Sequence, residues 1–220
     1  MNASEPLGIF GGTFDPVHLG HLRLAEEAMD ALGLSGVSWI PAGQPAHRSG
    51  PQVSAQDRLR MVRLATAGNH RFSVDAAEVE QTAPSYTVPT LERLRAVYGP
   101  QQPLVLILGA DAFAGLPGWH RWQALFALAH VAVAHRPGFR IEPASLPAAL
   151  ADEYARRASA DPAALRLTPA GHMVSFAMTQ LDISATQVRR QLAAGKSVRY
   201  LLPEAIIAYI EQHHLYSPAT

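Results

Sequence analysis

Two histidines three positions apart, His18 and His21, follow a pair of glycines near the start of the chain. The apolar residues of segment 7–10 predict a short buried strand, Gly11 and Gly12 predict a sharp turn, and the apolar spacing that follows predicts a helix. The first turn of such a helix offers free backbone N–H groups and the positive end of a dipole, which favour an anion such as a phosphate. Because residues three apart share a helix face, we expect both imidazoles to stabilise charge on that anion.

Other residues that could contact the same ligand are placed by the predicted strands. Gly20, between the histidines, carries no side chain that would block a ligand. The loop 41–48 follows a predicted strand and ends in His47 and Arg48, and Asp111 follows a long apolar run. In open α/β sheets, ligands bind beyond the carboxyl ends of the strands. These positions are therefore candidate ligand contacts.

Short apolar runs alternate with amphipathic stretches along the chain. The predicted strands are residues 7–10, 37–40, 72–74, 104–108, 131–134 and 173–176. The predicted helices are residues 19–32, 55–67, a stretch capped by Thr87 or Thr90 that ends near 98, a short helix through 128, and residues 146–159, 182–194 and 203–214. This alternation predicts an α/β fold with a doubly wound, mainly parallel sheet. We expect one domain, residues 1–220, in which residues 182–220 form a small C-terminal helical part.

The composition restricts the classes of function. The chain has 220 residues, 48% of them hydrophobic, and its 18 Lys and Arg balance 18 Asp and Glu. A long nucleic-acid surface needs a basic excess, so we expect no nucleic-acid partner. No apolar run approaches ~18 residues, so we expect no membrane span. The absence of cysteine excludes disulfides and thiolate nucleophiles, and together with an N-terminus unlike a signal peptide it favours the cytoplasm.

Three common site types are disfavoured by the residues present. The dinucleotide fingerprint G-x-G-x-x-G is absent from the first turn, which argues against a nicotinamide dehydrogenase. The segment 195–197, Gly-Lys-Ser, resembles the tail of a P-loop, but Arg190 stands where the first glycine belongs, and Gly195 is better interpreted as a helix C-cap. A zinc site would need a third ligand beside the two histidines, and no residue is indicated.

Two longer motifs carry a family resemblance. Segment 11–21, GGTFDPVHLGH, resembles the phosphate loop of the nucleotidyltransferase superfamily with its His-x-Gly-His signature, and segment 183–189, ISATQVR, is similar to that superfamily's second signature. Within the superfamily, segments 45–48, 84–87 and 109–111 together with Trp119 resemble the bacterial nicotinate mononucleotide adenylyltransferases. The resemblance runs from residue 7 to about 216. One departure is PAHR where the family usually has Pro-Pro-His-Lys, and arginine retains the charge.

The resemblance implies a Rossmann-like nucleotidyltransferase that transfers AMP from ATP to the 5′-phosphate of nicotinate mononucleotide. The products are nicotinate adenine dinucleotide and pyrophosphate, and the acceptor attacks directly, without a covalent enzyme intermediate. The implied catalytic residues are His18, His21 and Arg189. The implied ATP-binding residues are Gly11, Gly12, Thr13, Phe14, His18, Gly20, His21, Gly109, Asp111, Ser184, Thr186 and Arg189. Asp111 would accept a ribose hydroxyl, although it could instead be a helix cap.

The acceptor half of the site follows from the same resemblance. The implied residues for nicotinate mononucleotide are His47, Arg48, Tyr86, Thr87, Trp119 and His120. Arg48 would hold the phosphate, Trp119 would stack on the pyridine ring, and Thr87 with nearby backbone N–H groups would recognise the carboxylate. Trp119 could instead be core packing, as is expected of Trp122. Mg²⁺ would enter with the ATP phosphates and need few or no protein ligands.

Other functions remain open at this point. A pantetheine-phosphate adenylyltransferase or a cytidylyltransferase would use the same chemistry, but would not require the segment 84–87 or Trp119. A non-catalytic nucleotide sensor could share the fold, although the complete phosphate-binding set argues against decay. A fragment of a class I aminoacyl-tRNA synthetase also carries paired histidines around a glycine, but this chain lacks a lysine-rich second signature and a basic surface.

Overall fold

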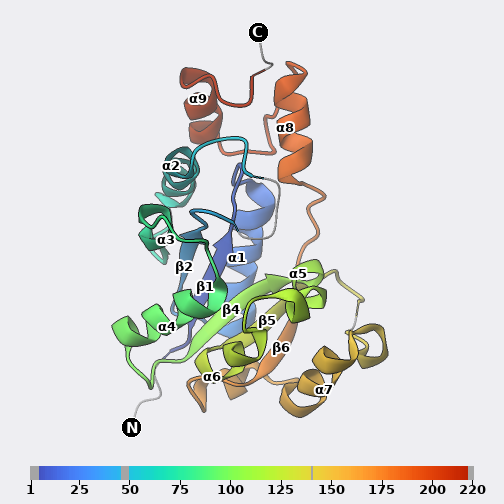
Figure 1. The fold of residues 1–220 in the computed structure, drawn as a ribbon. Coiled ribbons are helices and arrows are strands. Elements are labelled where there is room, and N and C mark those ends of the chain that lie inside the picture. The colour runs from blue at the N-terminus through green and yellow to red at the C-terminus, as the bar shows by residue number, and fades with distance from the viewer. Residues whose placement is uncertain (1–4, 46–49, 140, 218–220) are drawn as a thin grey trace.

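The computed structural model describes residues 5–45, 50–139 and 141–217. Within these ranges, parallel strands form one sheet in the order β3-β2-β1-β4-β5-β6 (Figure 1). The strands are β1 (Leu7–Gly12), β2 (Gly36–Pro41), β3 (Phe72–Val74), β4 (Leu104–Gly109), β5 (His130–His135) and β6 (Met173–Ala177). The predicted parallel, doubly wound α/β fold is confirmed.

Helices cover both faces of this sheet. They are α1 (Leu19–Leu32), α2 (Ala55–Thr66), α3 (Ala77–Glu80), α4 (Thr87–Tyr98), α5 (Ala110–Ala114), α6 (Leu125–Leu128), α7 (Ala148–Arg157), α8 (Ala185–Ala193) and α9 (Glu204–Gln212). Side chains alternate along β4, so that Val105 and Ile107 pack in the core on the side of α1 and α2, whereas Leu106 packs with α4, α5 and α6. Strands that are buried on both faces consist of continuous apolar residues, and the apolar run 104–108 indicated a strand of this kind.

Strand β1 is longer than the sequence predicted. Gly11 and Gly12 pair in register with Ile40 and Pro41 of β2, so the expected turn at the two glycines is wrong and the chain turns after them. The glycine at position 12 is required by packing, because a Cβ there would lie 2.9 Å from the ring of Phe14. Glycine in a strand commonly marks such a close approach.

Some helix boundaries also differ from prediction. Helix α4 begins at Thr87 after extended Tyr86, so neither Thr87 nor Thr90 caps it, and the Thr90 hydroxyl instead donates to Glu78 Oε1 at 2.5 Å. Helices α3 and α5 were not predicted, because four or five residues are too few to show an apolar period. Helix α7 falls inside the weakly patterned stretch where one helix was expected.

Helices α8 and α9 lie at one end of the molecule, where α9 packs against α2 (Figure 1). Helix α8 begins at Ala185, three residues later than the expected start. The C-cap of α8 is Ala194, one residue before the predicted Gly195. Gly195 has a φ of 63° and donates its N–H to the carbonyl of Leu192, so it is the left-handed glycine that follows the C-cap and ends the helix. Helix α9 buries Ile206, Ile207 and Ile210 in the core shared with α1 and α2.

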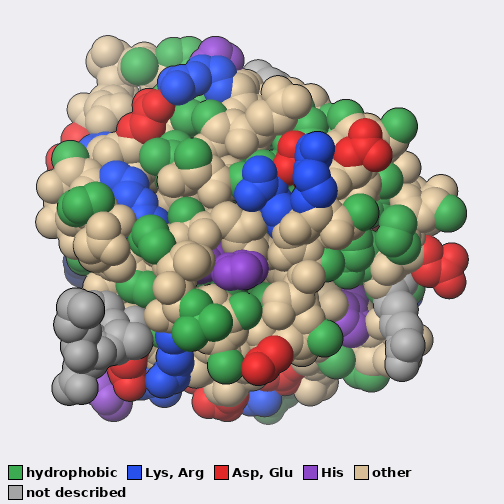
Figure 2. All heavy atoms as spheres, turned by 90° about the horizontal axis from the view of Figure 1, so that it is seen from below, with side chains coloured by type: hydrophobic (Ala, Val, Ile, Leu, Met, Phe, Trp, Pro, Cys, Tyr) green, Lys and Arg blue, Asp and Glu red, His purple; other side chains and the backbone are tan. Residues whose placement is uncertain are grey.

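The end of the molecule opposite α8 and α9 shows acidic and basic side chains interspersed with apolar ones (Figure 2). Within the described ranges, no helix combines the length and the apolar character needed to cross a membrane.

Candidate active site

The sheet order places a topological switch point at β1. The chain passes from β1 to β2 on one side of the sheet and later returns to β4 on the other side of β1. The residues that follow β1 and β4 therefore meet at the carboxyl ends of two neighbouring strands, where open α/β sheets bind ligands. His18 and His21 lie in the segment after β1, and Asp111 lies directly after β4.

The two histidines lie against each other at the start of α1. His18 immediately precedes the helix, and the centroids of the two rings are 3.6 Å apart with an interplanar angle of 29°. The backbone N–H of His18 donates to Nδ1 of His21 at 3.2 Å. Because this bond needs a lone pair on Nδ1, a neutral His21 carries its proton on Nε2, which is therefore a hydrogen-bond donor.

Both imidazoles are neutral at pH 7 before a ligand binds. Burial lowers the pKa of His18 to about 4, and burial together with the neighbouring His18 lowers the pKa of His21 well below its usual value. His18 Nδ1 is buried and has no hydrogen-bond partner in the part of the chain that is described. A phosphate placed beside these rings would favour their protonated forms and accept their N–H groups.

Packing holds the histidine rings in place. A Cβ at Gly20 would lie 3.0 Å from His18 Nδ1, so in the structure this glycine makes room for the His18 ring. The Phe14 ring meets the His21 ring edge to face at 5.2 Å and packs on Trp39. Phe14 has a φ of 50°, an uncommon conformation for a bulky residue, and is only 3% exposed. Such a conformation costs roughly 1–3 kcal/mol and persists only where the surroundings impose it.

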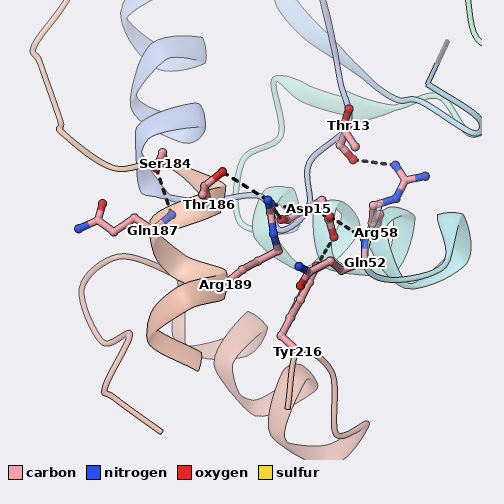
Figure 3. A network of polar contacts seen from close by, with 9 residues as sticks. All are labelled: Thr13, Asp15, Gln52, Arg58, Ser184, Thr186, Gln187, Arg189 and Tyr216. Carbon is pink, nitrogen blue, oxygen red and sulfur yellow. Dashed lines mark hydrogen bonds and ion pairs between the residues drawn. The ribbon is translucent and has the colours of Figure 1, made fainter. Parts of the chain in front are cut away.

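Arg189 of α8 reaches the loop that precedes the histidines (Figure 3). Its Nη1 donates to the backbone carbonyl of Asp15 at 2.7 Å, and its Nη2 donates to the Thr186 hydroxyl at 3.3 Å. The carbonyl of Ile183 lies 3.7 Å from where a Cβ of Gly20 would be. The two sequence signatures, which are more than 160 residues apart, thus meet in space.

Ser184 and Thr186 lie at the amino end of α8. The Ser184 hydroxyl accepts the Gln187 N–H at 3.1 Å and so caps the helix (Figure 3). Both residues line a surface hollow of about 300 Å³ whose other lining residues are Gln187, Arg190, Gln191, Ala194 and Lys196. Arg190 and Lys196 add positive charge to this hollow beside the second signature. The sequence motif did not indicate a role for either side chain.

Asp15 joins several segments, although the sequence motif assigned it no role. Its carboxylate is 6% exposed and accepts the Tyr216 hydroxyl at 2.7 Å and the Gln52 N–H at 2.9 Å (Figure 3). Burial and the hydrogen bond to Asp15 raise the pKa of Tyr216, so the tyrosine remains a donor. Tyr216 lies 201 positions from its partner, and no local pattern could have revealed the contact.

Arg58 of α2 was also missed by the sequence reasoning. It is 1% exposed, and its guanidinium donates to the carbonyl of Thr13 at 2.6 Å and to the carbonyl of Gly43 at 2.9 Å. Burial lowers its pKa, and the nearby Asp15 opposes that shift. Arg58 lies four residues before the buried Val62, so a helical projection would have placed a charge on the apolar face.

The proposed acceptor residues are placed in part. His47 and Arg48 lie outside the described residues. The Ser85 hydroxyl accepts the N–H groups of Gly43 and Gln44 at 3.0 and 3.3 Å, which joins the loop after β2 to the segment that enters α4. The rings of Tyr86 and His120 lie 4.7 Å apart, and Thr87 opens α4.

The two tryptophans differ in burial, and Asp111 is not a helix cap. Trp122 is 9% exposed and belongs to the core, whereas Trp119 is half-buried against it. The residue that precedes α5 is Gly109, so the helix-cap alternative for Asp111 is wrong. Asp111 is exposed, and its carboxylate has no hydrogen-bond or ion-pair partner within the described ranges. Those ranges contain no group of three His, Asp or Glu side chains placed to hold one metal ion.

The sequence is similar to known proteins over nearly its whole length. The sequence model of the cytidylyltransferase-like family matches residues 9–191, which include both signatures. The chain belongs to the cytidylyltransferase-like family. A relative from Dechloromonas aromatica (strain RCB), named "Probable nicotinate-nucleotide adenylyltransferase", is 66% identical over 97% of this chain and 98% of its own. A relative of the same name from Pseudomonas putida (strain W619) is 50% identical over 97% and 96%.

Solved structures share the fold of this chain. The Plasmodium falciparum nicotinic acid mononucleotide adenylyltransferase complexed with NaAD has a TM-score of 0.72 over 96% of this chain and 97% of its own, at 14% identity. At that identity the match supports the fold alone. The relatives that match over nearly the whole length of both chains confirm the family resemblance carried by the two signature motifs.

Proposed function

We propose that the chain transfers the adenylyl group of ATP to the 5′-phosphate of nicotinate mononucleotide, which gives nicotinate adenine dinucleotide and pyrophosphate. The observation that carries the proposal is the meeting of the two signatures: Arg189 binds the loop that leads into His18 and His21. The names of the full-length relatives support the choice of substrates.

In the ATP half of the site, the protein positions the triphosphate and neutralises developing charge. A phosphate oxygen of the mononucleotide attacks the α-phosphorus, the bond from that phosphorus to the bridging oxygen breaks, and pyrophosphate leaves. His18 and His21 donate to the phosphates, and Arg189 with Ser184 and Thr186 holds the part that leaves. Preorganised donors of this kind stabilise the transition state because they need no reorganisation during the reaction.

Backbone groups and the ribose contact complete the ATP half. Gly11, Gly12, Thr13 and Phe14 line the nucleotide through their backbone, and Gly20 lies where the chain approaches it. Gly109 and Asp111 approach the adenosine ribose. The exposed, unpaired carboxylate of Asp111 at the end of β4 supports its role as an acceptor of ribose hydroxyls.

In the acceptor half, we propose that Arg48 and His47 hold the mononucleotide phosphate and that Trp119 stacks on the pyridine ring. Thr87, with the backbone near Tyr86 and His120, recognises the carboxylate. The 4.7 Å approach of the Tyr86 and His120 rings supports their joint contribution to one pocket wall.

The cofactor and the setting form the last part of the proposal. The ATP phosphates would carry Mg²⁺ into the site, and the ion would neutralise part of their charge. We further propose that residues 1–220 form one domain. We propose no nucleic-acid partner, because the 18 Lys and Arg are balanced by 18 Asp and Glu. We propose a cytoplasmic location, because the chain contains no cysteine.

The direct test is pyrophosphate release from ATP and Mg²⁺ with three acceptors: nicotinate mononucleotide, nicotinamide mononucleotide and phosphopantetheine. We expect the highest kcat/KM with nicotinate mononucleotide, and we expect Arg189→Ala to abolish most of the release. A clear preference for phosphopantetheine would overturn the proposed acceptor, and release without any acceptor would indicate hydrolysis.

A further inference from the structure

One buried arginine joins the two loops that the proposed function assigns to different substrates. Arg58 Nη1 donates to the carbonyl of Thr13, in the loop before the histidines, and Nη2 donates to the carbonyl of Gly43, in the loop after β2. The residue is 1% exposed, so water cannot replace either contact without opening the core. A planar guanidinium can hold two carbonyls in one fixed geometry, which an ammonium group cannot do.

The connection continues on the acceptor side. The Gly43 N–H donates to the Ser85 hydroxyl at 3.0 Å, and Ser85 directly precedes Tyr86 and Thr87. Gly43 also lies directly against the backbone of Glu78, where a Cβ would be 1.9 Å from the carbonyl oxygen. The hydrogen bond to Ser85 links the loop after β2 to the entry of α4.

The connection also continues on the ATP side. Asp15, two residues after Thr13, accepts the Arg189 guanidinium on its carbonyl at 2.7 Å and the Gln52 N–H on its carboxylate at 2.9 Å (Figure 3). Gln52 lies on the chain between the loop after β2 and α2. Arg58 thus joins the two loops, and Asp15 joins the loop before the histidines to the segment that leads into α2.

We propose that Arg58 is a positioning residue through which ATP and the mononucleotide strengthen each other's binding. The inference rests on the proposed function. Each substrate must fix the loop that it contacts, and Arg58 makes the two loops one unit. When one substrate binds and fixes its loop, Arg58 also fixes the other loop. The second substrate therefore loses less binding free energy to loop ordering. Linkage requires the effect to be the same in both directions.

The test variant is Arg58→Lys, which retains a charge but lacks the planar fork that holds the two carbonyls in one fixed geometry. The matched control is Arg95→Lys. Arg95 is likewise an arginine that joins two segments through carbonyls, donating to Leu128 at 2.7 Å and to Pro169 at 2.6 Å, but these residues precede β5 and β6 and so lie on the side of the amino ends of the strands. Ser85→Ala is a second variant. It removes the hydroxyl that accepts the Gly43 N–H, and because Ser85 is only half-buried we expect it to destabilise the fold less than Arg58→Lys.

The measurement is calorimetric titration of an ATP analogue with a methylene bridge between the α- and β-phosphates, in Mg²⁺, with and without saturating nicotinate mononucleotide. In the wild type, we expect the mononucleotide to tighten analogue binding by about 5–100-fold, the usual range of coupling between two sites. Arg58→Lys and Ser85→Ala should reduce this factor at least about fivefold, whereas Arg95→Lys should retain it even if its melting temperature falls.

An equal coupling factor in the wild type, Arg58→Lys and Ser85→Ala would overturn the inference, as would a wild-type factor of one. If Arg58→Lys does not fold, Ser85→Ala decides the matter. Failure of the proposed function looks different, because a wild type that neither binds the mononucleotide nor forms dinucleotide refutes both proposals. A wild type that turns over normally without coupling refutes the inference alone.

Discussion

The stability of the protein should depend on pH through His130, which is buried at the start of β5. Its side chain is 0% exposed, its Nε2 lies 2.9 Å from the carbonyl oxygen of Thr168, and its Nδ1 accepts the N–H of His172 at 3.0 Å. This pattern fits a neutral ring whose Nε2 carries the proton. Burial lowers the pKa of His130 to about 4, and His172 and Arg95 add to the effect.

The sign follows from the order of the two pKa values. The ring titrates near 6.5 in the unfolded chain and near 4 in the folded protein, so the unfolded state binds more protons between these values. The contribution of His130 is therefore complete above about pH 6.5 and is lost as the pH falls toward 4. A shift of this size corresponds to about 3 kcal/mol when the loss is complete, and to about 2.5 kcal/mol at about pH 4.5.

The assay is urea unfolding of the wild type and His130→Gln at several pH values from about 8 to about 4.5. Glutamine can still donate to the Thr168 carbonyl but does not titrate, so the variant should be less stable at high pH by about 1–3 kcal/mol. Its stability should fall less on acidification, and the two curves should converge by about 2 kcal/mol. Parallel curves would refute the reasoning, because they would show that His130 does not titrate as inferred.

Three further predictions concern the site. His18→Ala should lower kcat by about 10²-fold or more in a folded protein, the scale for one preorganised donor, and near-normal turnover would remove the assignment. Arg48→Ala should raise the KM for the mononucleotide much more than the KM for ATP, and the reverse would mean that the two half-sites are exchanged. Tyr216→Phe should weaken binding of the ATP analogue several-fold, because the hydroxyl holds Asp15 beside the phosphate arginine. The control Tyr209→Phe, which removes a similar 2.9 Å bond to Asp57, should lower thermal stability without this effect, and equal loss of binding in both variants would contradict the role of Tyr216.

The sequence predicted the fold where patterns are local. The apolar run 104–108 indicated a strand buried on both faces, and Gly33 and Gly195 indicated helix ends, all of which the structure confirms. The helix starts were less accurate, because Thr90 bonds to a distant glutamate instead of a helix end. Gly11 and Gly12 show the same limit, since strand pairing overrides their preference for a turn.

The site was predictable only in part. The motifs contained His18, His21 and Arg189, and the structure brings the loop before His18 and Arg189 into contact. Arg58 and Tyr216 carry no motif, because their partners are 45 and 201 positions away. A contact of that kind is decided by how the loops fold over the sheet, which no local pattern encodes.

The central claim is that the triphosphate of ATP is held between the histidines of α1 and the arginine of α8. The most direct measurement is a crystal structure with the methylene-bridged ATP analogue, Mg²⁺ and nicotinate mononucleotide. We predict phosphate oxygens within hydrogen-bond distance, about 2.7–3.2 Å, of a ring nitrogen of His18 or His21 and of the Arg189 guanidinium in the same molecule. A triphosphate bound elsewhere, with these three side chains making no contact to it, would contradict the account.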